Sequence, residues 1–116
     1  MNILFLDDNL VRCKMFSDEA SSAIIAYTAG ECVAAMKFAP RDIVWDYVLL
    51  DHDLGKKNGC GMDVVEWIME NRPPVKQFII HSHNVPAANR MVSLLQDAGY
   101  PCYHKPFCYK MGEELQ

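Results

Sequence analysis

The sequence predicts an α/β fold in which one five-stranded parallel sheet is covered by helices on both faces. Five short apolar segments with high β-propensity are separated by segments with helical periodicity or composition. These strand-like segments are almost continuously apolar, which is typical of parallel strands buried on both faces. The 116 residues, 51% of them hydrophobic and without internal repeat or linker, are expected to form a single domain over residues 1–116.

The first half of the chain contains two strand–helix pairs. Asn2–Leu6 is apolar up to a pair of aspartates and is expected to be a buried strand. Over Asn9–Ala20 the apolar residues recur at a spacing suited to a helix lying on a sheet. A second strand is expected at Ala23–Thr28. Gly30–Phe38 has helical composition and ends just before Pro40, since proline cannot continue a helix.

The second half repeats this alternation. Asp46–Gly55 contains the third strand, and Met62–Asn71 is an amphipathic helix stopped by two prolines. Lys76–Asn84 contains the fourth strand, and Pro86–Gly99 is a helix closed by its glycine. Tyr100–His104 is expected to be the fifth strand. The residues after it are too few for a long closing helix, so the last helix is expected to be short or missing.

Composition excludes several classes of protein. No apolar run approaches the roughly 20 residues that a membrane-spanning helix needs. The formal net charge of −4 argues against a non-specific nucleic-acid binder, which needs a basic surface. The five cysteines are odd in number and show no C-x-x-C spacing, and no secretory leader precedes the first strand. We therefore expect reduced thiols and a cytoplasmic protein.

Polar and ionisable residues gather where the expected strands end. Because right-handed crossovers bring all carboxyl ends of a parallel sheet to one edge, these residues should lie close together. An isolated aspartate there is usually a turn former or a helix cap, and Asn9 or Asp8 as well as Asn84 are candidate caps. The coincidence of all four histidines and several aspartates favours a functional site. The residues concerned are Asp7, Asp8, Asp51, His52, Asp53, His81, Ser82, His83, Asn84, His104 and Lys105.

Carboxylates packed closely at this edge would repel one another unless a cation lay among them. Asp7, Asp8 and Asp51 are the expected ligands. Oxygen ligands of this kind suit Mg²⁺ or Mn²⁺, while the nearby imidazoles leave a softer metal open.

This pattern resembles a response-regulator receiver domain. In that family an acidic pair after the first strand, an aspartate ending the third, a serine or threonine ending the fourth and a Lys-Pro after the fifth hold Mg²⁺ and a phosphorylated aspartate. The matching residues here are Asp7, Asp8, Asp51, Ser82 and Lys105. The resemblance implies a flavodoxin-like receiver fold with strand order 2-1-3-4-5.

A narrower resemblance is to receiver-like domains of the cyclic-phosphate processing group. The motifs that carry it are "FLDD" at Phe5–Asp8, "DHDLG" at Asp51–Gly55 followed by Gly61 and Trp67, and "HS" at His81–Ser82 followed by Asn84 and Met91. This resemblance implies turnover of a phosphate ester rather than storage of a phosphoryl group.

Five residues are expected to act in catalysis. Asp51 and Asp53 are two positions apart, which puts them on one face of an extended chain. This Asp-x-Asp arrangement resembles haloacid dehalogenase phosphatases, in which the first aspartate attacks phosphorus and the second is the general acid and base. His81 or His83 could move a proton to or from the reacting oxygens. Lys105 would neutralise phosphate charge, as the receiver resemblance implies.

A second set of residues is expected to bind the substrate. Lys56 and Lys57 lie in the loop after "DHDLG", where flexible cations could hold phosphates, although a solvated turn is an equal alternative. The full set is His52, Ser82, Asn84, Lys56 and Lys57.

The sequence thus predicts a divalent-metal-dependent phosphohydrolase or phosphodiesterase that acts on a cyclic phosphate or cyclic-nucleotide-type substrate. A single-domain response regulator phosphorylated on Asp51 and a non-catalytic phospho-ligand binding protein are the alternatives. The expected partner is a small phosphorylated or cyclic-phosphate ligand, or an RNA end. A homodimer could form through the face that the short C-terminal tail leaves open.

Overall fold

The computed structural model describes all 116 residues and contains an all-parallel, five-stranded sheet of order β2-β1-β3-β4-β5. This confirms the predicted α/β fold and the strand order. The strands are β1 (Ile3–Leu6), β2 (Ile24–Ala26), β3 (Tyr47–Leu50), β4 (Phe78–Ile80) and β5 (Cys102–His104). The helices are α1 (Leu10–Glu19), α2 (Ala29–Lys37), α3 (Gly61–Asn71), α4 (Val85–Asp97) and α5 (Met111–Glu114).

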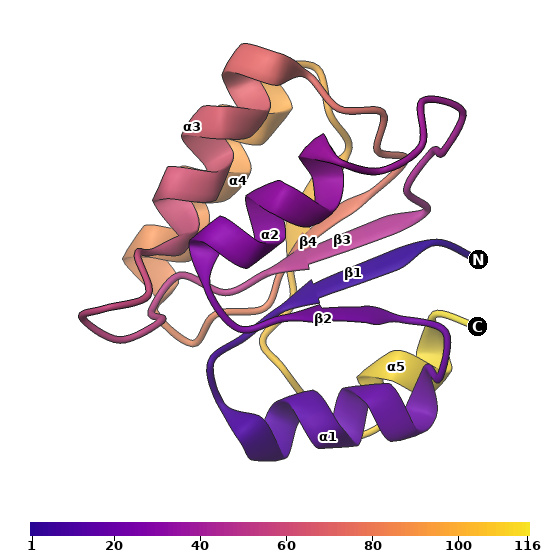
Figure 1. The fold of residues 1–116 in the computed structure, drawn as a ribbon. Coiled ribbons are helices and arrows are strands. Elements are labelled where there is room, and N and C mark those ends of the chain that lie inside the picture. The colour runs from indigo at the N-terminus through magenta and orange to yellow at the C-terminus, as the bar shows by residue number, and fades with distance from the viewer.

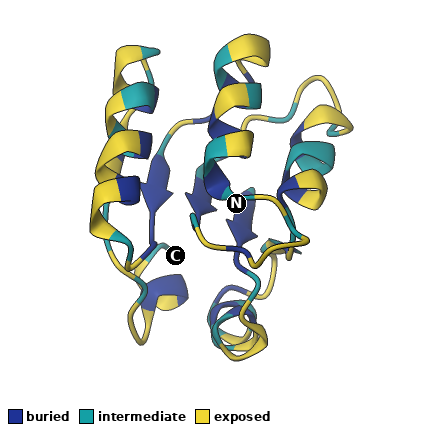
Figure 2. Cartoon of the chain, turned by 90° about the vertical axis from the view of Figure 1, so that its left-hand side faces the viewer, coloured by how far each residue is buried: buried dark blue, intermediate teal, exposed yellow.

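The molecule has three layers. Helices α2, α3 and α4 cover one face of the sheet, and α1 with α5 covers the other (Figure 1). Side chains alternate between the two faces of the sheet along each strand. In β1, Leu4 and Leu6 pack in the larger core cluster, and Ile3 and Phe5 pack in the smaller cluster on the α1 side. Strands β1 and β4 and most of β3 are buried, and the outer faces of the helices are exposed (Figure 2).

Strand register fixes which residues meet at the carboxyl edge of the sheet, at the left of Figure 1. Phe5 in β1 is level with Leu49 in β3, and Leu49 is level with Ile79 in β4. Two residues further along each strand, the side chain returns to the same face, which here is the α1 side. The residues brought together in this way are Asp7, Asp51 and His81.

The last helix is short, as predicted. Helix α5 packs against α1, and a Cβ atom at Gly112 would lie 3.0 Å from the Phe16 carbonyl oxygen, so the glycine lets the two helices approach closely. Beside α5 the face of β5 is open, with Tyr103 and Tyr109 exposed. A homodimer through this face stays a prediction.

None of the helices has both the length and the apolar character that crossing a membrane would require. All five cysteines are free thiols, and three of them, Cys13, Cys32 and Cys102, are buried core residues.

Candidate active site

Three buried side chains with donor atoms meet at the carboxyl edge of the sheet. Asp7 follows β1, Asp51 follows β3 and His81 follows β4, and none is more than 5% exposed. One donor atom from each lies within 4.8 Å of the other two. Asp8, the third carboxylate of the predicted cation site, lies outside this group and beside Gly55 in the loop after β3.

Arg12 provides the positive charge at this cluster. Its Nε donates to Asp7 Oδ2 at 2.7 Å and its Nη2 donates to Asp7 Oδ1 at 2.9 Å, a bidentate pair. Nη2 also lies 3.7 Å from Asp51 Oδ2. Asn9 caps α1 by accepting from the Arg12 N–H, and this fixes the turn that carries the guanidinium. The hydrogen bond to Asp7 raises the pKa of Arg12 despite its partial burial.

Asp51 forms the floor of the site. Burial and the neighbouring charge of Asp7 raise its pKa to about 6, while the His52 N–H bond and Arg12 act in the opposite direction. The His52 N–H donates to Asp51 Oδ1 at 2.8 Å, which leaves Oδ2 to face Arg12. Asp51 is therefore an unusually basic carboxylate, and its ionised form needs positive charge nearby.

His81 is held rigidly beneath the same cluster. Its ring stacks on Phe5 with centroids 4.7 Å apart and meets Phe107 edge-on at 6.3 Å. Its Nε2 donates to the Leu6 carbonyl oxygen at 2.8 Å, and its Nδ1 lies 3.9 Å from Asp7 Oδ2. Complete burial lowers the pKa of His81 to about 4, although Asp7 opposes the shift. The ring is therefore neutral at physiological pH.

A small pocket of about 130 Å³ opens from Asp51 to the surface. It has no apolar lining residue, and Asp53 and His83 stand at its exposed side. The residues that line it are Arg12, Asp51, Asp53, His81, Ser82, His83 and Asn84. Pockets that enclose a whole small-molecule ligand have volumes of about 300–1,000 Å³, so this one suits a phosphate group rather than a whole nucleotide.

Asp53 joins two other predicted site residues at this mouth. Its Oδ1 accepts from His52 Nδ1 at 2.8 Å, and its Oδ2 accepts from Asn84 Nδ2 at 3.4 Å. The bond from His52 lowers the pKa of Asp53, so this carboxyl is ionised. Asn84 also caps α4 through the Ala87 N–H, and Ser82 Oγ accepts from the Asn84 N–H. The cap predicted for α4 is therefore present and belongs to the site.

The predicted lysines lie elsewhere. Lys105 pairs with Glu114 of α5, which raises its pKa, and does not line the pocket. Lys56 is exposed, and Lys57 lines a shallow groove between α2 and α3. His104, at the end of β5, donates through Nε2 to the Ser82 carbonyl oxygen at 2.7 Å, so it supports the loop that carries Ser82.

Gly61 holds the end of β3 in place by having no side chain. A Cβ atom at this position would lie 2.0 Å from the Asp51 carbonyl oxygen and 2.7 Å from Met91 Cε. The Gly61 N–H donates to the His52 carbonyl oxygen at 2.9 Å. The first turn of α3 therefore rests directly on the backbone of the two residues that floor the site.

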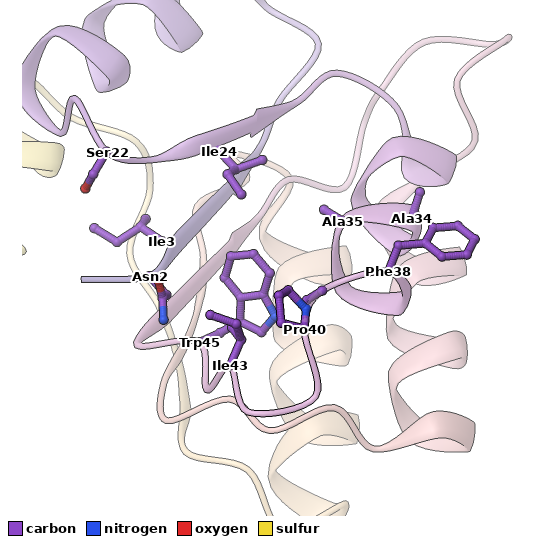
Figure 3. A pocket seen from close by; sticks show the side chains of 11 residues that line it. Asn2, Ile3, Ser22, Ile24, Ala34, Ala35, Phe38, Pro40, Ile43 and Trp45 are labelled. Atoms are coloured by element: carbon purple, nitrogen blue, oxygen red, sulfur yellow. The ribbon is translucent and has the colours of Figure 1, made fainter.

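A separate cavity of about 340 Å³ lies away from the carboxyl edge (Figure 3). It is mostly apolar and is lined by residues of α2, the start of β1 and the turn before β3, among them Phe38, Pro40 and Trp45. It contains no titratable side chain, so it has no part in the chemistry of the carboxyl edge.

The donor set fits a divalent cation. Asp7 and Asp51 supply carboxylate oxygens of the kind that Mg²⁺ and Mn²⁺ prefer. The pKa of Asp51 is raised first by burial and second by the charge of Asp7, and a bound cation would offset both effects. Asp7 and Asp51 would hold the ion. The sequence motifs that predict the site do not include Arg12. Its position one turn after the acidic pair, on a helix that begins at the site, was the signal available.

Comparison with solved structures finds receiver domains of response regulators. The CheY-like receiver domain from Methanospirillum hungatei has a TM-score of 0.60 at 22% identity, covering 98% of this chain and 92% of that chain. The Thermotoga maritima CheB response-regulator domain has a TM-score of 0.65 at 18% identity, covering 99% of this chain and 87% of that chain. The Francisella response regulator 1452 receiver domain has a TM-score of 0.66 at 11% identity, covering 98% of this chain and 92% of that chain. At these identities the likeness is one of fold.

Comparison with curated proteins finds no significant match. Comparison with protein families finds the cyclic-phosphate processing receiver domain, whose model matches residues 2–97. That match covers most of the chain and includes the acidic pair, the "DHDLG" segment and the "HS" segment. The chain belongs to the family of cyclic-phosphate processing receiver domains.

Proposed function

We propose that this receiver domain hydrolyses a cyclic phosphate ester in a reaction that depends on a divalent cation. One observation carries the proposal. Two side chains able to move protons, Asp53 and His83, line the same small pocket as the basic carboxylate Asp51. A receiver that only stores a phosphoryl group has no use for proton carriers beside its aspartate, because they would shorten the life of the acyl phosphate.

The chemistry divides into two steps. Asp51 attacks phosphorus, the bond to one ester oxygen breaks, and the substrate stays attached to phosphorus through its other ester oxygen. His83 gives a proton to the oxygen that leaves. In the second step water attacks phosphorus and releases Asp51, while the His52–Asp53 pair takes the proton from that water. The product is an open phosphomonoester.

His52 and Asp53 are suited to this second step as a unit. The ionised Asp53 can only accept a hydrogen bond, so His52 Nδ1 carries the proton of the 2.8 Å bond between them. The bond holds the Asp53 carboxylate at the pocket, where Asp53 can accept the proton of the attacking water. Asn84 restrains Asp53 from the other side.

Positive charge for the phosphate comes from two sources. The Arg12 guanidinium lines the pocket and is only partly exposed, so it can turn from Asp7 towards phosphate oxygens. Receiver domains bind Mg²⁺ at an acidic pocket, and here Asp7 and Asp51 would hold Mg²⁺ or Mn²⁺. A bound cation would offset charge on the phosphate oxygens.

The second candidate is a single-domain response regulator that carries its phosphoryl group on Asp51. The presence of Asp7, Asp51 and Ser82 at the receiver positions favours it. The pairing of Lys105 with Glu114 counts against it, since the receiver resemblance assigns that lysine to the phosphoryl group. A non-catalytic binder of a phosphorylated ligand would use the same pocket without the proton carriers.

The test is a hydrolysis assay on the purified protein with Mg²⁺ or Mn²⁺. Nucleoside 2′,3′-cyclic phosphates, an RNA oligonucleotide with a cyclic phosphate end, and cyclic dinucleotides form the substrate panel. We expect conversion of at least one class by the wild type and loss of conversion in Asp51→Asn. Asp42→Asn, a change of the same chemistry in an exposed turn, serves as the control. No conversion across the panel would overturn the proposal.

A further inference from the structure

The hydrogen bond made by His81 fixes where its lone pair points. The Leu6 carbonyl oxygen has no proton to give, so Nε2 of His81 must carry the hydrogen of the 2.8 Å bond between them. Since Nε2 carries this hydrogen, Nδ1 is the ring nitrogen that remains to bind an ion. Nδ1 makes no hydrogen bond to another residue, and His81 is 1% exposed.

That lone pair faces the carboxylates. Nδ1 lies 3.9 Å from Asp7 Oδ2, too far for a hydrogen bond, and His81 lines the pocket together with Asp51. Two atoms that can only accept, turned towards each other in a buried site, repel unless a proton or a cation lies between them. His81, Asp7 and Asp51 thus form a buried set of three donors, in which Arg12 now supplies the positive charge.

The distances suit a shared ion. The three donor atoms lie within 4.8 Å of one another. Three donors around one divalent transition metal, each at about 2.1 Å, are about 3.0–3.6 Å apart. Side-chain movements of up to about 1 Å would bring all three donors to one ion.

The surroundings of His81 match those of a metal-binding histidine. Such a histidine almost always donates its other N–H to a carbonyl or carboxylate, which fixes the tautomer and the ring orientation. The Leu6 carbonyl does this here, and stacking on Phe5 holds the plane of the ring. The ring pays no ordering cost when an ion arrives, because it is already fixed.

From these contacts we propose that His81 Nδ1 is the third ligand of the cation held by Asp7 and Asp51, and that this nitrogen selects a first-row transition metal over Mg²⁺. Imidazole nitrogen binds Mn²⁺, Fe²⁺, Co²⁺ and Zn²⁺ readily, whereas Mg²⁺ prefers oxygen ligands and water. The inference rests on the proposed function only for the presence of a cation at the two carboxylates. It concerns which ion binds and not which ester is cleaved.

Arg12 is the group that a metal must displace. It holds both oxygens of Asp7, and its side chain is 31% exposed, so it can leave towards the pocket mouth. Metal binding and the Arg12–Asp7 pair are mutually exclusive at the oxygen that the metal takes. Release of Arg12 would also free a cation for the phosphate of the substrate.

The test uses Mn²⁺ as a probe on the purified, metal-free protein with no substrate present. Pulsed electron paramagnetic resonance of the Mn²⁺ complex should show coupling to a directly bound ¹⁴N nucleus. His81→Asn should abolish the coupling, because it offers an amide oxygen near the position of Nδ1. His83→Ala should keep it, since His83 is exposed and lies outside the buried group.

Titration provides the second measurement. The wild type should bind Mn²⁺ at least about 10-fold more tightly than Mg²⁺, and His81→Asn should weaken Mn²⁺ binding about 10- to 100-fold while changing Mg²⁺ binding little. If His81→Asn fails to fold, the wild-type spectrum alone decides. Bound Mn²⁺ without ¹⁴N coupling would overturn the inference and leave the proposed hydrolysis standing. Coupling to ¹⁴N without any hydrolysis would support the inference and overturn the proposed hydrolysis. Absence of Mn²⁺ binding would also overturn it.

Discussion

Arg12 donates two hydrogen bonds to Asp7, at 2.7 and 2.9 Å, from the first turn of the helix that follows it. The same guanidinium lies 3.7 Å from Asp51, so Arg12 contacts both buried carboxylates. In the absence of a metal ion, Arg12 is the cation that allows both carboxylates to be buried. Binding of a metal and of Arg12 at Asp7 are therefore in competition.

Replacing Arg12 should separate its stabilisation of the buried carboxylates from its competition with a metal ion. Arg12→Gln removes the charge with little change in helix propensity. In the metal-free protein we expect the free energy of unfolding at pH 7.5 to fall by ~1–3 kcal/mol, because Asp7 loses its charged partner. Mn²⁺ should bind more tightly to the variant than to the wild type. Chemical denaturation and metal titration measure the two effects.

Arg90→Gln is the matched control, since Arg90 is exposed on α4 and forms no ion pair. Equal unfolding free energies and equal Mn²⁺ affinities in the Arg12 variant and the wild type would contradict the competition.

Asp51→Asn should stabilise the metal-free protein at neutral pH. The pKa of Asp51 in the folded protein is about 6 against an ordinary value of 3.8, so the folded state binds the proton more tightly than the unfolded state. Ionising Asp51 therefore costs stability as the pH rises from about 4 through 6. This difference corresponds to up to ~3 kcal/mol above pH 7 and to nothing below pH 4.

The measurement is the denaturation midpoint of wild type and Asp51→Asn from pH 4 to pH 8, with EDTA present. The two curves should diverge as the pH rises. Addition of Mn²⁺ should stabilise the wild type more than the variant, because Asp51 is a ligand. A wild type that stays as stable as Asp51→Asn at pH 8 without metal would contradict the burial cost assigned to this carboxylate.

Gly61 should tolerate no side chain. Gly61→Ala puts a Cβ atom 2.0 Å from the Asp51 carbonyl oxygen, so α3 must move away from the end of β3. We expect a loss of ~1–3 kcal/mol in unfolding free energy and weaker metal binding, since Asp51 moves with its backbone. Gly30→Ala in α2 is the control: its nearest neighbour is 3.9 Å away, and the change should be neutral or stabilising by up to ~1 kcal/mol.

Asp53 and His83 should affect turnover without affecting the metal. Asp53→Asn and His83→Ala should each slow cyclic-phosphate hydrolysis by the order of 10² to 10⁴ expected for losing a proton carrier. Mn²⁺ affinity should stay within about threefold of the wild-type value, because neither residue belongs to the buried donor group. Asp18→Asn, an exposed aspartate on α1, is the control. Unchanged rates in both variants would move the proton transfers to other groups.

The buried part of the site follows from the sequence for a simple reason. Parallel strands in register bring the residues at their carboxyl ends to one edge, so Asp7, Asp51 and His81 could be grouped from the order of the segments alone. The alternation of side chains along a strand also puts them on one face. The fold was predictable because β1 to β4 are continuous apolar runs that alternate with helical segments.

The remaining contacts depend on geometry that the sequence pattern does not contain. The contact of Arg12 with Asp7 depends on the direction in which α1 leaves β1, and the pairing of Lys105 with Glu114 depends on a four-residue helix whose formation had no local signal. Asp8 was expected as a ligand because it belongs to the acidic pair after the first strand, and the structure places its carboxylate beside Gly55 and not in the buried donor group. Alternation would put His81 and His83 on one face, but β4 ends at Ile80 and the chain bends at His83, so His81 is buried and His83 is exposed.

The central claim, that Asp51 turns over a phosphate ester and does not store a phosphoryl group, is tested most directly by ³¹P nuclear magnetic resonance on wild-type protein with Mn²⁺ replaced by diamagnetic Mg²⁺ or Zn²⁺. One sample receives a 2′,3′-cyclic phosphate and a second receives a small phosphoryl donor. We expect the cyclic phosphate resonance to be replaced by that of a phosphomonoester, and no lasting acyl phosphate to accumulate in the second sample. A long-lived phosphoaspartate at Asp51, together with an unchanged cyclic phosphate, would contradict the account and identify the chain as a signalling receiver.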